Sequence, residues 1–309
     1  MATTVFYPHA IDFADGDLIT QLTNITPAYN FQDVIEFSSG DTAPLWSGSL
    51  SSAPAIPFTT RQCKSILDLC DPFALPTRGK VVAYDARGGG NVDVWLRKGE
   101  AFGLRTADAT AEHERARLTM AFLEWSTITA TQNQLAEIAC RLVAAYDGTN
   151  DPMVLTQQAL SGTRAVHHLF TLGPVTLNGT ALDGLQSWTM SNNTVLEVIF
   201  DSGVPFPRYI GINNHSPTLM ARVRAGTLMR TIGTRGTAIT SLTWYLRKLQ
   251  ASALAEPDAS QVHIQFVATA GTVKARQVDN TGMVDLFFQL QRPVAVTNPY
   301  LFDTTAAIA

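Results

Sequence analysis

The chain contains 309 residues, of which 46% are hydrophobic and 16% are charged, and it carries a formal net charge of −4. The hydrophobic content excludes intrinsic disorder, the acidic balance argues against a dedicated nucleic-acid-binding protein, and the lack of any run of about 18 apolar residues excludes a membrane-spanning helix. At roughly 150 residues per domain, the length predicts two domains, each with its own core.

The first residues, MATTVFYPHAIDFADGD, predict no signal peptide, because they have neither a basic start nor a sufficiently long apolar segment. We therefore expect a protein that is made in the cytoplasm and keeps its thiols reduced. Cys63, Cys70 and Cys140 match no zinc-site spacing, since a seven-residue step is not a Cys-x-x-Cys pair. The sequence predicts no metal and no cofactor.

Most of the chain has the alternating pattern of β-strands. Short runs rich in Val, Ile, Thr and aromatic residues are bounded by Gly, Pro, Asn and Asp. The clearest runs are 33–37, 80–84, 91–96 and 194–200. Turn dipeptides predict tight connections between strands at 15–16, 147–148, 178–179 and 183–184.

Helical periodicity is scarce. Residues 59–69 are one candidate, with apolar side chains on one face, and residues 109–117 are a second, shorter candidate. Residues 134–146 fit either period, and we favour a strand because a turn follows at 147–152.

The sequence also contains an internal similarity. Residues 30–40, NFQDVIEFSSG, align with residues 193–203, NTVLEVIFDSG, at a constant offset of 163. Farther along, 118–130 resemble 262–275 at an offset of about 145, which predicts extra residues in the first half near 85–114. Self-similarity in a fixed order is typical of a duplicated domain, although short β segments also align by chance.

We therefore predict a mainly β fold with two tandem, duplicated β-sandwich or β-barrel domains and a few short helices. The first domain covers residues 1–160 and includes the insertion near 85–114. The second domain covers residues 161–309.

Candidate catalytic motifs are few. Asp201-Ser202-Gly203 has the local form of an aspartic protease loop, but the aligned position in the first half is Ser38, so the required second carboxylate is missing. A hairpin turn explains the motif better. No catalytic residue is predicted.

Candidate metal sites are equally weak. Adjacent His167 and His168 would point to opposite faces of a strand, and His113 lies between two glutamates without a partner at metal-binding spacing. The acidic segment 12–17 lacks the spacing of a calcium loop. We expect solvated or interface histidines and an acidic turn.

The glycine-rich segment Arg87, Gly88, Gly89 and Gly90 is no phosphate loop, because no Gly-Lys-Ser/Thr follows it. A hairpin tip is the simpler interpretation. Together with the termini and 85–114, we predict it as a candidate assembly loop.

Three segments carry a resemblance to a known family. Residues 146–155 (YDGTNDPMVL), 172–179 (LGPVTLNG) and 185–190 (LQSWTM) resemble the tail-tube, or major tail, proteins of tailed bacteriophages. The resemblance covers about half of the chain, mostly 139–217. It rests on the similarity of these short segments rather than on a diagnostic motif.

The resemblance implies β-sandwich or barrel subunits, flanked by a helix, that join into rings around a channel. Stacked rings would form the tube through which DNA passes. A duplicated subunit could form a trimer that mimics a hexamer. The implied location is the virion tail, and the implied partners are other copies, other virion proteins and DNA in transit.

Elementary physics agrees with self-assembly, since exposed strand edges pair with another copy unless they are blocked. Two alternatives remain open. One is a capsid decoration, tail-terminator or adaptor protein. The other is a monomeric two-domain module that binds carbohydrate or a cell surface, with Trp46, Trp95, Trp125, Trp188 and Trp244 either stacking on sugars or packing in the core.

Overall fold

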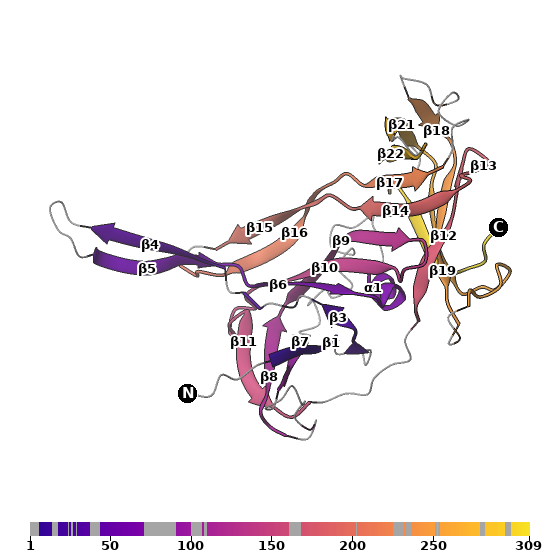
Figure 1. Cartoon of the computed structure of the whole chain (residues 1–309). Helices are drawn as coiled ribbons and strands as arrows, with labels where there is room; N and C mark the ends of the chain where they lie inside the picture. Colours follow the sequence, from indigo (N-terminus) through magenta and orange to yellow (C-terminus); the bar gives the residue numbers. More distant parts are fainter. Residues whose placement is uncertain are drawn as a thin grey trace.

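The structure is a computed structural model that describes residues 6–13, 18–23, 25, 27–28, 30–37, 44–70, 91–99, 107, 110–160, 168–201, 203–224, 232, 236–250, 252, 254–278, 282–293 and 298–309. Within these residues the protein is mainly β, with antiparallel sheets and one α-helix (Figure 1). The predicted mainly β class is confirmed. None of the described helical residues belongs to a helix long and apolar enough to cross a membrane.

The first half of the chain contains the helix α1 (Cys63–Leu69). Its strands are β1 (Phe6–Asp12), β2 (Leu18–Ile19), β3 (Leu22–Thr23), β4 (Phe31–Phe37), β5 (Pro44–Ser52), β6 (Ala55–Thr60), β7 (Asn91–Lys98), β8 (His113–Thr119), β9 (Ala121–Thr131), β10 (Glu137–Ala144) and β11 (Met153–Gln158).

The second half begins after residue 160. Its strands are β12 (Phe170–Leu177), β13 (Thr180–Ala181), β14 (Leu185–Ser191), β15 (Thr194–Phe200), β16 (Pro207–His215), β17 (Thr218–Val223), β18 (Thr237–Ile239), β19 (Leu242–Lys248), β20 (His263–Ala268), β21 (Gly271–Val278), β22 (Val284–Leu290) and β23 (Leu301–Ala306).

Three large sheets build the body. A nine-stranded central sheet has the order β18-β21-β22-β17-β14-β9-β10-β6-β3, so it runs through both halves. One five-stranded sheet belongs to each half, with the orders β2-β1-β7-β8-β11 and β13-β12-β19-β20-β23. Two hairpins, β4–β5 and β15–β16, extend away from this body on the same side (Figure 1).

The two halves have the same strand order. In the central sheet, β9-β10-β6-β3 of the first half corresponds to β21-β22-β17-β14 of the second, and the five-stranded sheets correspond strand for strand. The two extended hairpins also match, because Phe31 lies opposite Ser52 and Thr194 lies opposite His215, and both residues differ by 163.

A single residue type closes the base of both hairpins. Asn30 and Asn193 have positive φ values of 49° and 45°, a region that Asn tolerates better than most residues. Each donates from its side chain to the backbone carbonyl 23 residues later, at 3.0 Å.

The correspondence changes its offset after the helix. His113 and His263 occupy the same position in β8 and β20, and they differ by 150. The predicted offset of about 145 for this part is therefore wrong. The 13 extra residues of the first half (163 minus 150) lie between Leu69 and Asn91.

One predicted helix is also wrong. Residues 109–117 were expected to include a short helix, but 113–119 form β8, which pairs with β7 and β11 on its two sides. Paired edges on both sides satisfy the backbone of this segment and override its weak helical propensity. The helix within 59–69 is confirmed as α1, and the strand within 134–146 is confirmed as β10.

The core is continuous across the halves. Buried side chains from the central sheet, from both five-stranded sheets and from α1 form a single cluster. Tyr300 links the halves, because its ring lies 6.4 Å from that of Trp125 in β9 and 6.5 Å from that of Trp244 in β19.

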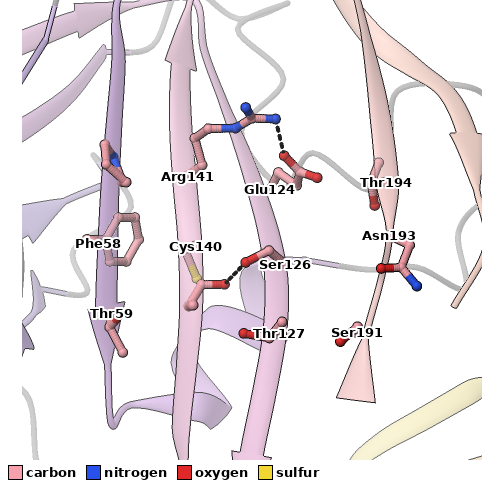
Figure 2. A pocket seen from close by; sticks show the side chains of 12 residues that line it. Phe58, Thr59, Glu124, Ser126, Thr127, Cys140, Arg141, Ser191, Asn193 and Thr194 are labelled. Atoms are coloured by element: carbon pink, nitrogen blue, oxygen red, sulfur yellow. Dashed lines mark hydrogen bonds and ion pairs between the residues drawn. The ribbon is translucent and has the colours of Figure 1, made fainter. Parts of the chain in front are cut away.

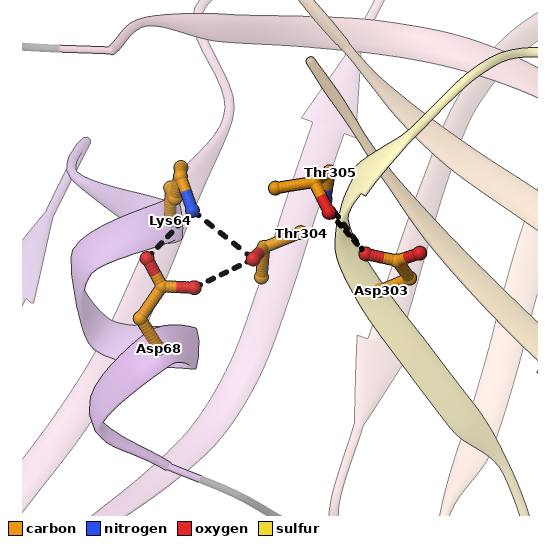
Figure 3. A network of polar contacts seen from close by, with 5 residues as sticks. All are labelled: Lys64, Asp68, Asp303, Thr304 and Thr305. Carbon is orange, nitrogen blue, oxygen red and sulfur yellow. Dashed lines mark hydrogen bonds and ion pairs between the residues drawn. The ribbon is translucent and has the colours of Figure 1, made fainter. Parts of the chain in front are cut away.

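A polar network reinforces this link at α1 (Figure 3). Lys64 Nζ donates to Asp68 at 2.7 Å and to the hydroxyl of Thr304 in β23 at 3.0 Å, and the same hydroxyl donates to Asp68 at 2.6 Å. The helix of the first half therefore contacts the last strand of the second half.

Candidate functional site

The most distinctive feature of the fold is the junction at which the two halves share one sheet. Strand β9 pairs with β14 in antiparallel orientation, with Thr131 opposite Ser187 and Thr127 opposite Ser191. Such a junction consists mainly of backbone hydrogen bonds, so its geometry can be repeated wherever two strand edges of the same shape meet.

One backbone contact next to this junction fixes the direction of its hydrogen bonds. The Asn192 N–H donates to the Ser126 carbonyl at 2.8 Å, so these two residues form a hydrogen-bonded pair. The next pair, Thr127 and Ser191, is therefore a non-hydrogen-bonded one. In an antiparallel ladder the next residues, Ile128 and Met190, then direct their backbone N–H and C=O groups towards each other.

Strand β21 is the counterpart of β9 and presents a similar edge. Ile128 lies opposite Ile138, and Val278 lies opposite Val284, and in both strands a bulge lies at the same distance on the N-terminal side of this position. Val278 therefore directs its N–H away from β22, as Ile128 directs its N–H away from β10. Among the described residues, no strand pairs with Val278 on that side.

The start of the β21 edge is covered. Strand β18 places Thr237 opposite Val273 and Ile239 opposite Gly271. The covered residues 271–273 of β21 correspond to residues 121–123 of β9. Strand β14 does not pair with those residues of β9 but with 127–131. The covered and the open parts of the β21 edge are thus distinct.

Strand β3 is the counterpart of β14 and ends the sheet on the other side. The bridge between Ala28 and Ala55 repeats the pairing of Ser191 with Thr218 at the same offset of 163. By this register Pro27 occupies the place of Met190. Its missing N–H would have pointed outwards, so the proline leaves the pairing with β6 intact and removes one donor from the open edge.

The solvent-exposed face of the central sheet carries a shallow hollow of about 500 Å³ (Figure 2). Arg141 pairs there with Glu124 at 2.7 Å, and the Ser126 hydroxyl donates to the Ala139 carbonyl at 3.2 Å. Burial raises the pKa of the neighbouring Cys140 thiol well above its ordinary value. The Glu124 carboxylate is paired with Arg141, the Ser126 hydroxyl donates to a carbonyl and the Cys140 thiol is protonated. These side chains therefore provide no activated nucleophile.

The sequence-predicted site residues lie partly outside the described part of the chain. Arg87, Gly88, Gly89 and Gly90 lie outside the described residues, as does His167, and the candidate assembly loop stays a prediction. Asp201 forms an ion pair with Arg208 at 3.1 Å. Burial raises the pKa of Cys63 and Cys70 to about 12. Across the described part of the chain, no group of three metal-binding side chains converges.

Two of the histidines, His113 and His263, have structural roles. His113 accepts the Lys98 N–H at Nδ1 (3.1 Å), and its Nε2 lies 2.8 Å from the Ala107 carbonyl, so Nε2 carries the proton. His263 makes the same pair of contacts, with the Lys248 N–H at 3.1 Å and the Pro257 carbonyl at 3.0 Å. Both side chains are fully buried, so the expectation of a solvated or interface histidine is wrong for His113.

Four of the five tryptophans lie in the core. Trp95, Trp125, Trp188 and Trp244 are at most 1% exposed, so they cannot stack on a sugar without unfolding the sheets. Of the two interpretations left open, core packing is correct for these four residues.

Within the described part of the chain, the candidate functional site is therefore the pair of edges without a strand partner near Pro27 and Val278, which sequence inspection missed. The offset of 163 would have aligned Pro27 with Met190, but no local pattern shows that β14 pairs with β9. No protein-family model matches the chain, and no curated protein matches it either.

Proposed function

We propose that this protein is a non-enzymatic virion structural protein of a tailed bacteriophage, which self-assembles into rings stacked as a tail tube for DNA. The observation that carries the proposal is the β9–β14 junction, because the counterparts of its two strands, β21 and β3, lie towards opposite ends of the same sheet and have edge residues without a strand partner among the described residues. The resemblance of residues 146–155, 172–179 and 185–190 to tail-tube proteins supports the same function.

The assembly step is edge pairing between copies. If β21 of one copy pairs with the edge that runs from β3 to the Ala28–Ala55 bridge of the next copy, the contact repeats the β9–β14 register, and Val278 N–H donates to the Pro27 carbonyl. The two edges differ, so the contact is head-to-tail and closes into a ring when the rotation per copy fits. A domain duplication would explain the common strand order, and three copies would then give six similar units.

The first test is negative-stain electron microscopy with light scattering over a concentration series of the full chain. We expect rings or hollow tubes of uniform diameter. Single rings that never stack would favour the tail-terminator or decoration function. A strict monomer at every concentration would overturn the proposal and restore the monomeric binding module.

A pair of proline variants tests the edge itself. Val278→Pro removes the outward N–H and should raise the concentration needed for assembly by at least about tenfold, because the ring also blocks close strand approach. Ala181→Pro is the matched control, since Ala181 lies on the exposed edge strand β13 and its N–H also points away from its partner strand, because the next residue, Leu182, donates its own N–H to Val175 of β12. Equal assembly of the two variants would show that β21 is not the junction.

A further inference from the structure

The halves also contact each other where α1 packs against β23. The strand that corresponds to β23 in the first half, β11, has an exposed side at the equivalent place. Strand β23 lies at the end of its five-stranded sheet, and Phe302 lies opposite the fully buried Phe266 on the face that points to the core. Two residues farther along β23, the Thr304 hydroxyl forms hydrogen bonds with Lys64 and Asp68 of α1. The helix of the first half thus covers the core-facing side of this strand.

Strand β11 occupies the same place in the first half. Leu155 lies opposite Ala116, and Ala116 and Phe266 are counterparts at the offset of 150. Directly opposed residues point to the same face of a sheet. Leu155 therefore lies on the core-facing side of its sheet, as Phe302 does in the other five-stranded sheet. Yet the Leu155 side chain is 41% exposed, and Gln157 on the same side is exposed as well.

We propose that the core-facing side of β11, at Leu155 and Gln157, is the docking site for the second half of a neighbouring copy of this chain. This inference rests on the proposed ring. Within one chain, the first half uses β9 and α1 together to contact the second half. If the second half contacts the next copy in the way the first half contacts the second, β21 pairs with β3 of that copy. The region that ends at Ile232, the counterpart of Leu69, then lies on β11 of the same copy.

The chemistry of the occupant follows from its sequence. By the offset of 163, the sequence aligns Thr227 and Thr231 with Lys64 and Asp68 of α1, with Leu228, Met229 and Arg230 between them; these five residues lie outside the described part of the chain. The segment therefore has two hydroxyls in place of the Lys64–Asp68 ion pair, and its two apolar side chains, Leu228 and Met229, suit contact with Leu155.

Two adjacent residues provide a matched pair of variants. Leu155→Glu places a charge in the proposed interface and should raise the assembly midpoint concentration at least about tenfold, since burying an unpaired carboxylate is costly. Val154→Glu is the control, because Val154 is 40% exposed on the same strand but points to the opposite face. Its midpoint should stay within about threefold of the parent.

A photo-crosslinker at position 155 tests the occupant directly, in full-length protein under assembling conditions. Mass spectrometry should find crosslinks to second-half peptides near Ile232 of another copy, and none when the protein is dilute and monomeric. This second readout decides the matter even if Leu155→Glu fails to fold, as circular dichroism would reveal.

The outcomes separate the two proposals. If the parent protein never assembles, the proposed function and this docking site fall together. If it assembles, but crosslinks from position 155 reach only first-half peptides or Leu155→Glu behaves like Val154→Glu, the ring stands and the docking site is overturned.

Discussion

At the scale of single residues, a buried polar group marks the boundary between the halves. Asn192 Oδ1 accepts hydrogen bonds from His215 Nε2 at 2.6 Å and from the Tyr300 hydroxyl at 2.8 Å, while the Asn192 amide donates to the Trp125 carbonyl at 3.3 Å. Because Oδ1 can only accept, His215 carries its proton on Nε2. Every member therefore has a partner, which a buried network requires.

This network predicts a pH dependence. Burial lowers the pKa of His215 to about 4, from 6.5 in the unfolded chain. The folded state holds the neutral ring, so its stabilisation is full above pH 6.5 and decreases as the pH falls towards 4. Between pH 7.5 and pH 4.5 the loss from this group should be about 2–3 kcal/mol.

The measurement is urea unfolding at both pH values, for the parent protein and for His215→Gln. Glutamine keeps a neutral donor but cannot titrate, so the variant should lose less stability at low pH by that amount. An equal loss in both proteins would show that His215 is not the titrating group.

At the scale of elements, the two open edges are unequal. Pro27 removes a donor from the β3 edge, and β18 covers the first residues of β21. Both features are ways in which proteins limit uncontrolled edge pairing. We infer that the junction between copies is weaker than the β9–β14 junction within a chain, which carries Met190 at the place of Pro27.

Pro27→Val should therefore strengthen assembly. It restores one outward N–H, and a backbone hydrogen bond contributes about 0.5–1.5 kcal/mol, which corresponds to a roughly two- to tenfold lower assembly midpoint. Light scattering over a dilution series measures the midpoint, with Pro57→Val in β6, a proline inside the sheet, as the control. A higher midpoint for Pro27→Val than for the parent would contradict the proposed register.

Local patterns predicted local elements well. The alternation of 33–37 and 194–200 gave β4 and β15, and the Asn178-Gly179 turn has the positive φ values of 48° and 80° that a tight hairpin needs. The error at 109–117 arose because helix-favouring Ala, Glu and Arg fill a strand that is held on both sides by other strands.

At the scale of the whole molecule, the sequence predicted the class of fold but not the way in which the halves are joined. The similarity at offset 163 was visible, whereas the counterparts His113 and His263 were missed because the second offset was placed near 145 instead of 150. The pairing of β9 with β14 spans residues far apart in sequence and has no local signature. The boundary near residue 160 stays a prediction, while the shared sheet and core join its two sides.

This joint can be tested by cleavage. A specific protease site inserted within 161–167 and then cut should leave two fragments that elute together in gel filtration, because the β9–β14 ladder, Tyr300 and the α1–β23 network still connect them. Separation of the fragments under native conditions would show that each half is an independent domain.

The inequality of the two edges has a consequence for mixtures. A copy that is defective only at β21 keeps an intact β3 edge, so it can still join a growing arc and then offers nothing to the following copy. Such a subunit acts as a chain terminator rather than as a bystander. In a cell that makes both proteins, a Val278→Pro copy would therefore be dominant, and it would reduce the yield of closed rings by more than its share of the pool.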